Sequence, residues 1–197
     1  DWCNIFKIDF NSNAGILIER SVLSIKKTKF SIGDIITKIK ADDRSTEDDK
    51  NLVIARFEAV DKWNLFSENA TDFNKMIASG ETNVIDLSAY NFVEDGQEIK
   101  DLVIALFCKK ILKTRLLARK EEEVAELSNE TVKKEAPLVW IFIDEAHEFL
   151  PREGTNLALN PLIQLLREGR QPGISLVLAT QQPGKIHTDV KIGRAHV

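Results

Sequence analysis

The sequence predicts an α/β fold in which a parallel sheet is combined with a helical insertion, and three segments support this prediction. Two apolar runs with the length of buried strands occur at 139–143 and 174–179, and both are rich in β-branched or aromatic residues. Between them, residues 160–168 carry apolar side chains at helical spacing. Because strand, helix and strand follow in this order, we expect a parallel βαβ unit whose strands are buried on both faces.

Length and composition fit one sizeable folded domain, or a domain with an insertion. The chain has 197 residues, of which 43% are hydrophobic and 29% charged, and its net charge is −4. This charge gives no general argument for nucleic-acid binding, but it leaves room for a local basic surface. Cys3 and Cys108 form no CxxC motif and suit a reducing compartment. Without a signal peptide or a membrane-length apolar run, we expect a soluble, cytoplasmic protein with no membrane association.

Residues 1–30 are expected to be the end of an upstream strand region. Residues 4–10 nearly alternate between apolar and polar types, and residues 16–18 form a short apolar run. These patterns predict two short strands. Because the chain starts at Asp1 in a segment of this kind, without a methionine, we expect a further part of the protein upstream.

Residues 31–80 are expected to form a helical insertion. Ser31 and Asp34 resemble a capping box, and apolar residues then follow at helical spacing. The acidic stretch 41–50 predicts a solvated turn between two helices. A third, short helix is expected to end at Gly80. Nothing in this segment has the pattern of a chemical site.

Residues 81–190 are expected to form the main α/β core. Residues 83–88 return to a strand pattern, with Asp86 as a polar residue near its end. An amphipathic helix is predicted over 97–117. Its outer face is basic and holds Lys109, Lys110, Lys113, Arg115, Arg119 and Lys120. This face could contact DNA phosphates, but the acidic run after it favours a solvated face, and 121–136 predicts a charged linker.

Two carboxylates, Asp144 and Glu145, directly follow the first apolar strand. In open parallel sheets, ligands bind outside the carboxyl ends of the strands, so both acids are expected at a ligand crevice. An apolar strand that ends in Asp-Glu has the form of a Walker B motif. In that interpretation Asp144 holds the magnesium of a bound nucleotide and Glu145 polarises the attacking water. A core strand whose polar end only meets solvent is the alternative that the strand alone leaves open.

Polar side chains also follow the second strand, and two arginines lie between the strands in sequence. Thr180 and Gln181 come directly after the second strand, and a polar group there can sense a γ-phosphate, because a parallel crossover brings both strand ends to one edge. Arg167 and Arg170 suit the charge of phosphoryl transfer, which in ring ATPases often involves a neighbour's arginine. Either arginine alone would more often form a surface salt bridge, but this context favours a functional role.

The strings IFIDEAHEFLPREGTN and LIQLLREGRQPGISLVLATQQPG resemble the HerA branch of the HerA/FtsK superfamily, which contains hexameric P-loop ATPases that pump double-stranded DNA. The resemblance spans about residues 1–190 and is strongest over 82–190. It implies part of a RecA-like P-loop ATPase core, ATP and Mg²⁺ as cofactors, and a homo-oligomeric, hexameric ring. It further implies double-stranded DNA as a partner and DNA end processing beside a NurA-type nuclease.

The resemblance also assigns roles to matching positions. It makes Asp144 the Walker B magnesium residue, Glu145 the catalytic glutamate and Gln181 the sensor. The arginine finger acting in trans is Arg170 by first choice, with Arg167 as second choice. The expected site residues are therefore Asp144 and Thr180 for the nucleotide and its magnesium, and Glu145, Gln181, Arg167 and Arg170 for catalysis. Gln182 departs from a basic residue often found in relatives.

One motif of the family is missing from the sequence. No GxxxxGK precedes a serine or threonine, and the only Gly-Lys pair, at 184–185, is followed by isoleucine. We expect the P-loop upstream of residue 1, so the chain alone should not hydrolyse ATP. Residues 191–197 match one reading frame of a common sequencing adapter and are excluded, which removes Arg194 and His196 as site candidates.

Three other functions remain open at this point. Residues 144–147 spell DEAH, and Leu-Ala-Thr at 178–180 lies where superfamily 2 helicases have Ser-Ala-Thr. A DEAH-type helicase, however, lacks the Arg-Glu-Gly-Arg helix end, and His147 is better explained as a structural or coupling residue. A conjugation, secretion or antiviral-defence motor of the same superfamily would keep the ATPase and change its load. A scaffold derived from an ATPase would have lost the P-loop and the activity.

Overall fold

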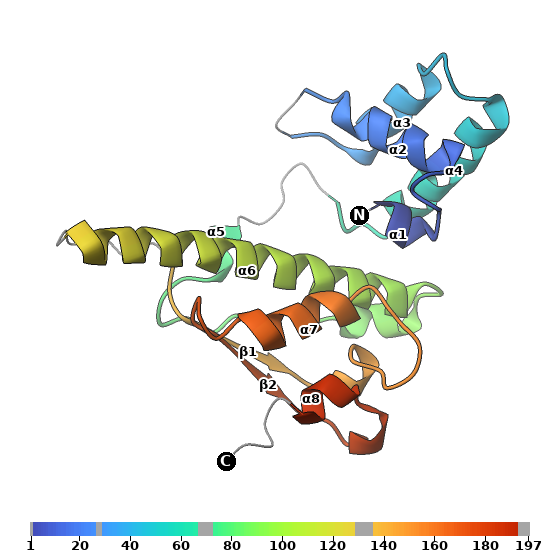
Figure 1. Cartoon of the computed structure of the whole chain (residues 1–197). Helices are drawn as coiled ribbons and strands as arrows, with labels where there is room; N and C mark the ends of the chain where they lie inside the picture. The colour runs from blue at the N-terminus through green and yellow to red at the C-terminus, as the bar shows by residue number, and fades with distance from the viewer. Residues whose placement is uncertain (1, 27–28, 67–72, 129–135, 193–197) are drawn as a thin grey trace. The chain divides into compact units, whose positions relative to one another are not determined.

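The fold is given by a computed structural model of the chain (Figure 1). It describes residues 2–26, 29–66, 73–128 and 136–192. The chain divides into two compact units, Asp1–Thr71 and Asp72–Val197, and each unit has its own hydrophobic core. The boundaries expected at residues 30 and 80 therefore fall inside the two units rather than between them.

The described part of the first unit is helical, so the two short strands predicted for its beginning are wrong. Helix α1 covers Trp2–Phe6 and helix α2 covers Asn13–Leu23. Ser12 caps α2, because its Oγ accepts the backbone N–H of Gly15 at 3.1 Å. A short apolar run fits a helix as well as a strand. Here packing decides, since Leu17 and Ile18 both lie in the core of the unit.

Two further helices complete the first unit. Helix α3 spans Ile32–Lys40, and its predicted capping box, made by Ser31 and Asp34, is confirmed. Helix α4 spans Glu47–Asp61 and begins at the Thr46 cap, so residues 47–50 of the acidic stretch predicted as a turn are helical. Three acidic residues in its first turn favour this start because they complement the helix dipole.

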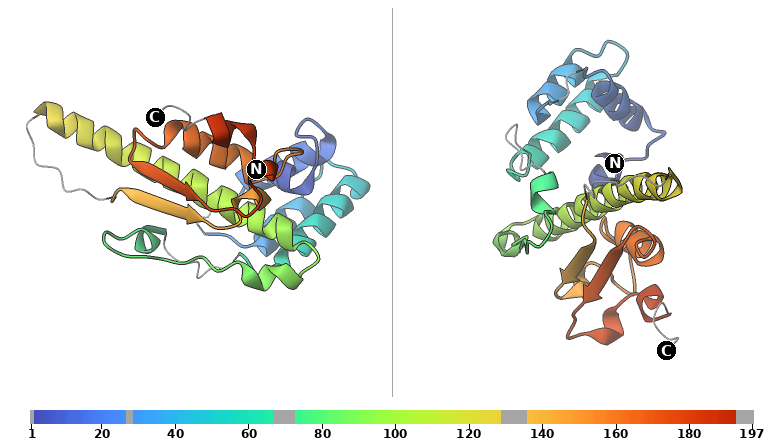
Figure 2. Two further views of the ribbon diagram at one scale, coloured as in Figure 1. Left: turned by 90° about the horizontal axis from the view of Figure 1, so that it is seen from below. Right: turned by 90° about the vertical axis from the view of Figure 1, so that its left-hand side faces the viewer.

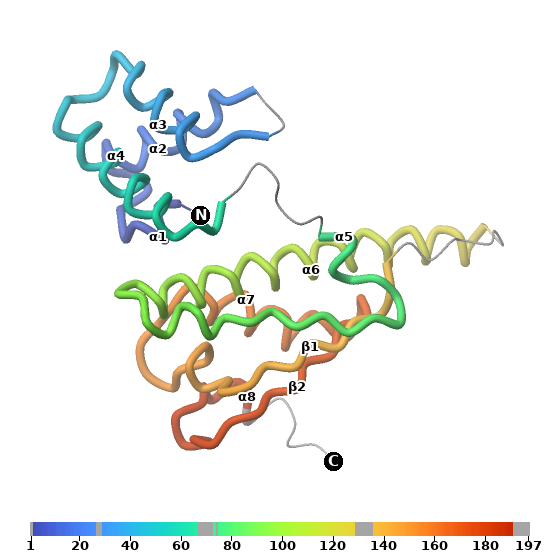
Figure 3. Tube along the Cα trace, turned by 180° about the vertical axis from the view of Figure 1, so that it is seen from behind, coloured from blue at the N-terminus to red at the C-terminus, as the bar shows by residue number. Residues whose placement is uncertain are grey.

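The second unit begins with short elements and a long helix. Helix α5 covers Phe73–Met76, the 3₁₀ helix η1 covers Ser88–Phe92, and helix α6 covers Gly96–Ser128. Figure 3 shows the segment between α5 and α6 running along α6 before the chain reverses. The strand predicted over 83–88 is wrong, because within the described residues this segment pairs with no strand.

Helix α6 continues past its predicted end and replaces part of the linker expected over 121–136. Ion pairs along the helix support this extension, because Arg119 lies 3.3 Å from Glu122, 3.1 Å from Glu123 and 3.5 Å from Glu126. The predicted basic face is also different from expectation, since Arg115 is only 1% exposed. Its guanidinium donates to the carbonyls of Pro172, at 2.7 Å, and Ala136.

The predicted parallel βαβ unit is confirmed. Strand β1 (Val139–Ile143) pairs in parallel with β2 (Ile174–Leu178), in a register that runs from Val139–Ile174 to Ile143–Leu178. Helix α7 covers Leu159–Glu168 and connects the two strands. It begins one residue before the expected cap at Asn160, because Asn156 Oδ1 accepts the backbone N–H of Leu159 instead. Figure 2 shows the two strands side by side and pointing the same way.

The two strands are covered on one face only within the described residues. Their inward side chains join α6 and α7 in one hydrophobic core. The other face exposes Trp140 by 66% and Phe142 by 72%, and their rings stack at 6.3 Å. The expectation that the strands are buried on both faces is therefore wrong for this part of the protein. It failed because aromatic residues on an open face and on a core face look alike in sequence.

Short elements follow the two strands. The 3₁₀ helix η2 (Ala146–Glu148) comes after β1, while the 3₁₀ helix η3 (Pro183–Lys185) and helix α8 (Thr188–Ile192) come after β2. The tail expected at 191–197 starts in the last turn of α8, and its residues 193–197 lie outside the described residues. No helix in the described part of the chain combines the length and apolar character needed to span a membrane.

Candidate functional site at the strand ends

The ends of β1 and β2 lie at the same edge of the sheet and are joined by backbone hydrogen bonds. The backbone N–H of Ala179 donates to the carbonyl of Ile143 at 2.9 Å, and Ala146 N–H donates to the carbonyl of Ala179 at 2.9 Å. The pairing of the strands therefore continues into the turns that carry the polar residues. This fixes Asp144 and Glu145 next to Thr180 and Gln181, as the crossover geometry predicts.

Glu145 has an unusual backbone conformation. Its φ of 46° and ψ of 43° lie in the left-handed region, which for a residue with a Cβ costs roughly 1–2 kcal/mol. The preceding residue supports this turn, because Asp144 Oδ1 accepts the backbone N–H of Glu145 at 2.9 Å. The turn lets the Glu145 side chain reach the end of β2.

Four side chains at this edge form one group, which we call the strand-end cluster: Glu145, His147, Thr180 and Gln181. Gln181 Nε2 donates to Glu145 Oε1 at 3.1 Å. Thr180 Oγ1 lies 3.0 Å from His147 Nδ1 and accepts the backbone N–H of Gln182 at 3.0 Å. Glu145 Oε2 is buried without a well-formed hydrogen bond and lies 3.3 Å from His147 Nδ1.

The cluster suits the chemistry of a hydrolytic centre. A carboxylate can accept a proton from water or orient it, and an amide beside it can register the state of a neighbouring phosphate. Asp144 is exposed at the same edge. Within the described ranges, no group of three or more His, Cys, Asp or Glu side chains is placed to hold a metal ion. Mg²⁺ in nucleotide sites is held by one or two carboxylates together with phosphates and waters, so a single Asp144 fits that ion.

The two arginines lie away from the strand-end cluster. Arg170 lies in the turn that precedes β2, and about 13 Å of strand separates this turn from Thr180. Arg167 is 69% exposed and pairs with Asp189 of α8 at 2.5 Å. The structure therefore does not bring either arginine to Glu145 of the same chain.

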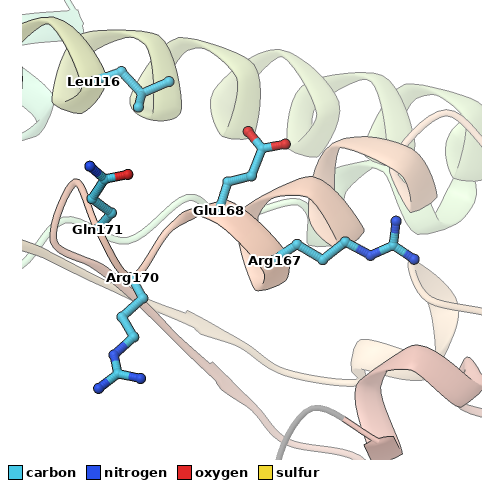
Figure 4. A pocket seen from close by; sticks show the side chains of 5 residues that line it. All are labelled: Leu116, Arg167, Glu168, Arg170 and Gln171. Carbon is cyan, nitrogen blue, oxygen red and sulfur yellow. The ribbon is translucent and has the colours of Figure 1, made fainter.

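The turn with Arg170 borders an open pocket of about 720 Å³. Its lining residues are Leu116 of α6 and Arg167, Glu168, Arg170 and Gln171 from the end of α7 and the turn after it. Figure 4 shows the Arg167 and Arg170 side chains pointing away from each other, with Arg170 also pointing away from α6. Arg170 is exposed and can reach a molecule that approaches this end of the sheet.

The surroundings of four groups were not predicted from the sequence. His147, expected only as a structural or coupling residue, belongs to the strand-end cluster. Arg115 is buried, although its position at helical spacing suggested the outer face. Asp101 is buried in α6, and this burial raises its pKa to about 6. Burial likewise raises the pKa of the Cys108 thiol to about 12, so this thiol is unreactive.

Comparisons with known proteins identify the family of the chain. The family model described as zonular occludens toxin (Zot) matches residues 82–197, which is more than half of the chain. Three proteins named DNA double-strand break repair helicase HerA are similar to the chain. The protein from Pyrococcus furiosus is 27% identical over 125 residues, which cover 58% of this chain and 23% of the relative.

The other two relatives cover more of the chain at similar identity. The Sulfurisphaera tokodaii protein is 26% identical over 146 residues, or 73% of this chain and 27% of the relative. The Saccharolobus solfataricus protein is 26% identical over 152 residues, or 76% of this chain and 27% of the relative. The chain spans about a quarter of the length of these relatives.

Proposed function

The chain belongs to the Zot family of HerA-like P-loop ATPases, and from that premise we propose that it is part of an ATP-driven motor that moves double-stranded DNA. The observation that carries the proposal is the contact between Glu145 Oε1 and Gln181 Nε2, 3.1 Å apart at the ends of two parallel strands. Such an edge is where open α/β sheets bind their ligands. Its acid, amide and hydroxyl groups are those that nucleotide hydrolysis uses.

Each residue of the edge has one task in this proposal. Asp144 holds Mg²⁺, and Thr180 supplies a hydroxyl for the nucleotide. Glu145 accepts a hydrogen bond from the attacking water and orients it, while Gln181 senses the γ-phosphate. When bound, ATP would supply the phosphoryl group and Mg²⁺ would neutralise the charge that develops on it.

The remaining parts of the site come from elsewhere in the assembly. The relatives are about four times as long as the matched segment, and we place the phosphate-binding P-loop in that further length. Arg170 acts as the finger for a neighbouring subunit, with Arg167 as the second choice. The exposure of Arg170 at the end of the sheet opposite Glu145 supports action in trans, because the side chain is accessible to a neighbouring copy but distant from Glu145 of its own chain. This requires a ring of copies, which we propose to be a hexamer.

The names of the relatives support a proposal for the DNA substrate. These proteins are named as helicases of DNA double-strand break repair. We propose that the protein acts on DNA ends in the cytoplasm, beside a nuclease of the NurA type. A conjugation, secretion or defence motor would use the same ATPase for another load.

The first test is hydrolysis and binding of ATP by the full-length protein with Glu145→Gln. The variant keeps the shape of the side chain but removes the carboxylate, so hydrolysis should fall at least about 100-fold while ATP binding is kept. Glu153→Gln is the matched control, because this exposed glutamate lies outside the cluster and its loss should leave turnover unchanged. Normal turnover in Glu145→Gln would contradict the proposal.

Mixing subunits tests the arginine. Arg170→Ala should abolish hydrolysis in the ring, and mixing it with Glu145→Gln should restore part of the turnover, because some interfaces then combine an intact Glu145 with an intact Arg170. Arg167→Ala mixed in the same way is the comparison. Rescue only with the Arg167 variant would transfer the finger to that residue.

The nucleic acid that stimulates hydrolysis separates the alternatives. Linear double-stranded DNA should increase the rate in the full-length protein, and circular DNA without ends should increase it less. Stimulation of a monomer by single-stranded RNA or DNA would support a DEAH-type helicase instead. No hydrolysis under any of these conditions would support the scaffold.

A further inference from the structure

We propose that His147 is a positioning residue, whose Nδ1–H holds the Glu145 carboxylate and links it to Thr180. From the sequence, only a general structural or coupling role is expected for this histidine. The effect of His147 on turnover rests on the proposed function. Which of its ring nitrogens carries the proton can be measured in the chain itself.

The geometry around His147 comes from both strands. His147 lies in η2, directly after β1, and its side chain is largely buried. Its Nδ1 lies 3.0 Å from Thr180 Oγ1, after β2, and 3.3 Å from Glu145 Oε2. One nitrogen atom therefore faces two oxygen atoms that belong to the ends of different strands.

The chemistry of these two oxygens decides which imidazole nitrogen carries the proton. Glu145 Oε2 is buried, and a buried carboxylate oxygen without a donor costs at least about 1–3 kcal/mol. If Nδ1 carried a lone pair, that lone pair would face the carboxylate and add repulsion. With a proton on Nδ1, the N–H can donate to Thr180 Oγ1 at 3.0 Å, and its positive end lies 3.3 Å from Oε2 in place of a lone pair. The structure therefore assigns the Nδ1–H form to His147.

The result is a carboxylate that is hydrogen-bonded at Oε1 and faced by the imidazole at Oε2. Gln181 holds Oε1 at 3.1 Å, and His147 approaches Oε2 at 3.3 Å. Thr180 is tied to the same imidazole and also accepts the backbone N–H of Gln182 at 3.0 Å. Fixing the orientation of a catalytic group through such neighbours typically changes activity about 10–100-fold. In this arrangement a displacement of the β2 end, through Thr180 or Gln181, reorients Glu145.

The tautomer of His147 can be measured by NMR on the nitrogen-15-labelled chain. The measurement uses the couplings between the ring nitrogens and the protons bound to the ring carbons. His187 is an internal reference, because its Nδ1 accepts the backbone N–H of Asp189 at 3.3 Å and its proton must therefore be on Nε2. We expect opposite tautomers for the two histidines, with signals assigned from His147→Asn and His187→Asn. An Nε2–H form of His147 would overturn the proposal.

Glu145→Ala gives a second readout in the same chain. Without the carboxylate, the Thr180 hydroxyl can donate to Nδ1, so the His147 population should shift toward the Nε2–H form while His187 stays unchanged. An unchanged Nδ1–H form in this variant would mean that Glu145 does not set the tautomer, and the proposal would fall.

The kinetic test compares three substitutions of His147 in the full-length protein. Asparagine places an amide N–H near the position of Nδ1, glutamine places one near Nε2, and alanine removes both. We expect kcat to fall about 10–100-fold in His147→Ala with unchanged ATP affinity, and to be restored more by asparagine than by glutamine. Equal rescue by both amides would contradict a role for Nδ1. If the wild type does not hydrolyse ATP, the proposed function fails while the tautomer result still decides this inference.

Discussion

The two units of the chain treat their polar groups differently. In the first unit, Arg20 donates to both carboxylate oxygens of Asp42, at 2.7 and 2.8 Å, and these bonds lower the pKa of Asp42 to about 2. In the second unit, burial raises the pKa of Asp101 to about 6, and Glu145 keeps a buried oxygen without a well-formed hydrogen bond. The Asp42 carboxylate therefore stabilises the first unit, whereas the second unit holds those of Asp101 and Glu145 at a cost.

This difference supports the proposed position of the catalytic site. Proteins tend to violate local rules of stability at functional sites. Backbone strain alone does not distinguish the units, because Lys7 in the first unit also has a positive φ, of 54°. Glu145 differs from Lys7 in adding a buried, poorly paired carboxylate to that strain. The combination marks the strand-end cluster.

The largest effect is expected at Arg115, which is a stabilising exception in the second unit. Arg115→Met should lower the free energy of unfolding by about 3–5 kcal/mol, because it leaves two carbonyls and Glu122 without their buried cation. Urea unfolding of the purified chain measures this. Arg119→Met is the control, since its partly exposed pairs are worth at most about 1 kcal/mol. Equal losses in the two variants would contradict the structural role of Arg115.

A smaller effect of opposite sign is expected at Asp101. Its pKa is about 6 in the folded chain against an ordinary value of 3.8, so the folded state binds the proton more tightly. Its contribution to stability is therefore present at low pH and is lost as the pH rises through about 6. Asp101→Asn should be more stable than the wild type by roughly 2–3 kcal/mol at about pH 7.5 and equal to it near pH 4. The amide still accepts the hydrogen bond from Gln97.

Urea unfolding of the wild type and of Asp101→Asn across this pH range measures the difference between their free energies of unfolding. Taking the difference removes the contributions of the other carboxylates, which are common to both chains. A difference that does not change with pH would show that the Asp101 carboxylate is not held at a raised pKa.

The smallest effect is expected at Asp42, with the reverse pH dependence. Since Arg20 lowers its pKa, the stabilisation is present above the ordinary value of 3.8 and is lost as the pH falls through about 2. Asp42→Asn should destabilise the first unit by about 1 kcal/mol at neutral pH, and the loss should shrink below about pH 4. Acid titration of the unfolding midpoint checks the sign. A loss that grows in acid would contradict the comparison between the units.

The sequence predicted those features that depend on neighbouring residues. The capping box at Ser31, the strands β1 and β2 and the helix between them follow from local patterns, and all are present. The position of both strand ends at one edge of the sheet was also predicted, because a parallel crossover connection brings the two ends to the same edge.

Long-range contacts explain what the sequence did not predict. Residues 4–6 and 16–18 are helical where strands were expected. The packing of Trp2 and Phe6 on Phe57 of α4, with ring centroids 5.1 and 4.9 Å apart, supports the first of these helices. The burial of Arg115 depends on carbonyls at the starts of both strands, far away in sequence. The left-handed turn at Glu145 has no local signal, since no glycine or asparagine occupies that position.

The central claim is that Glu145 is held at the strand ends at a cost in stability. The most direct test is the free energy of unfolding of the chain with Glu145→Gly, compared with Lys7→Gly. Glycine relieves the strain of the left-handed backbone at both positions, but it also increases the conformational freedom of the unfolded chain. The free energy of unfolding of Lys7→Gly should therefore rise by at most about 1 kcal/mol. Glu145→Gly also removes the buried oxygen and should gain about 2 kcal/mol. A loss of stability in Glu145→Gly, or a gain no larger than in Lys7→Gly, would contradict the account.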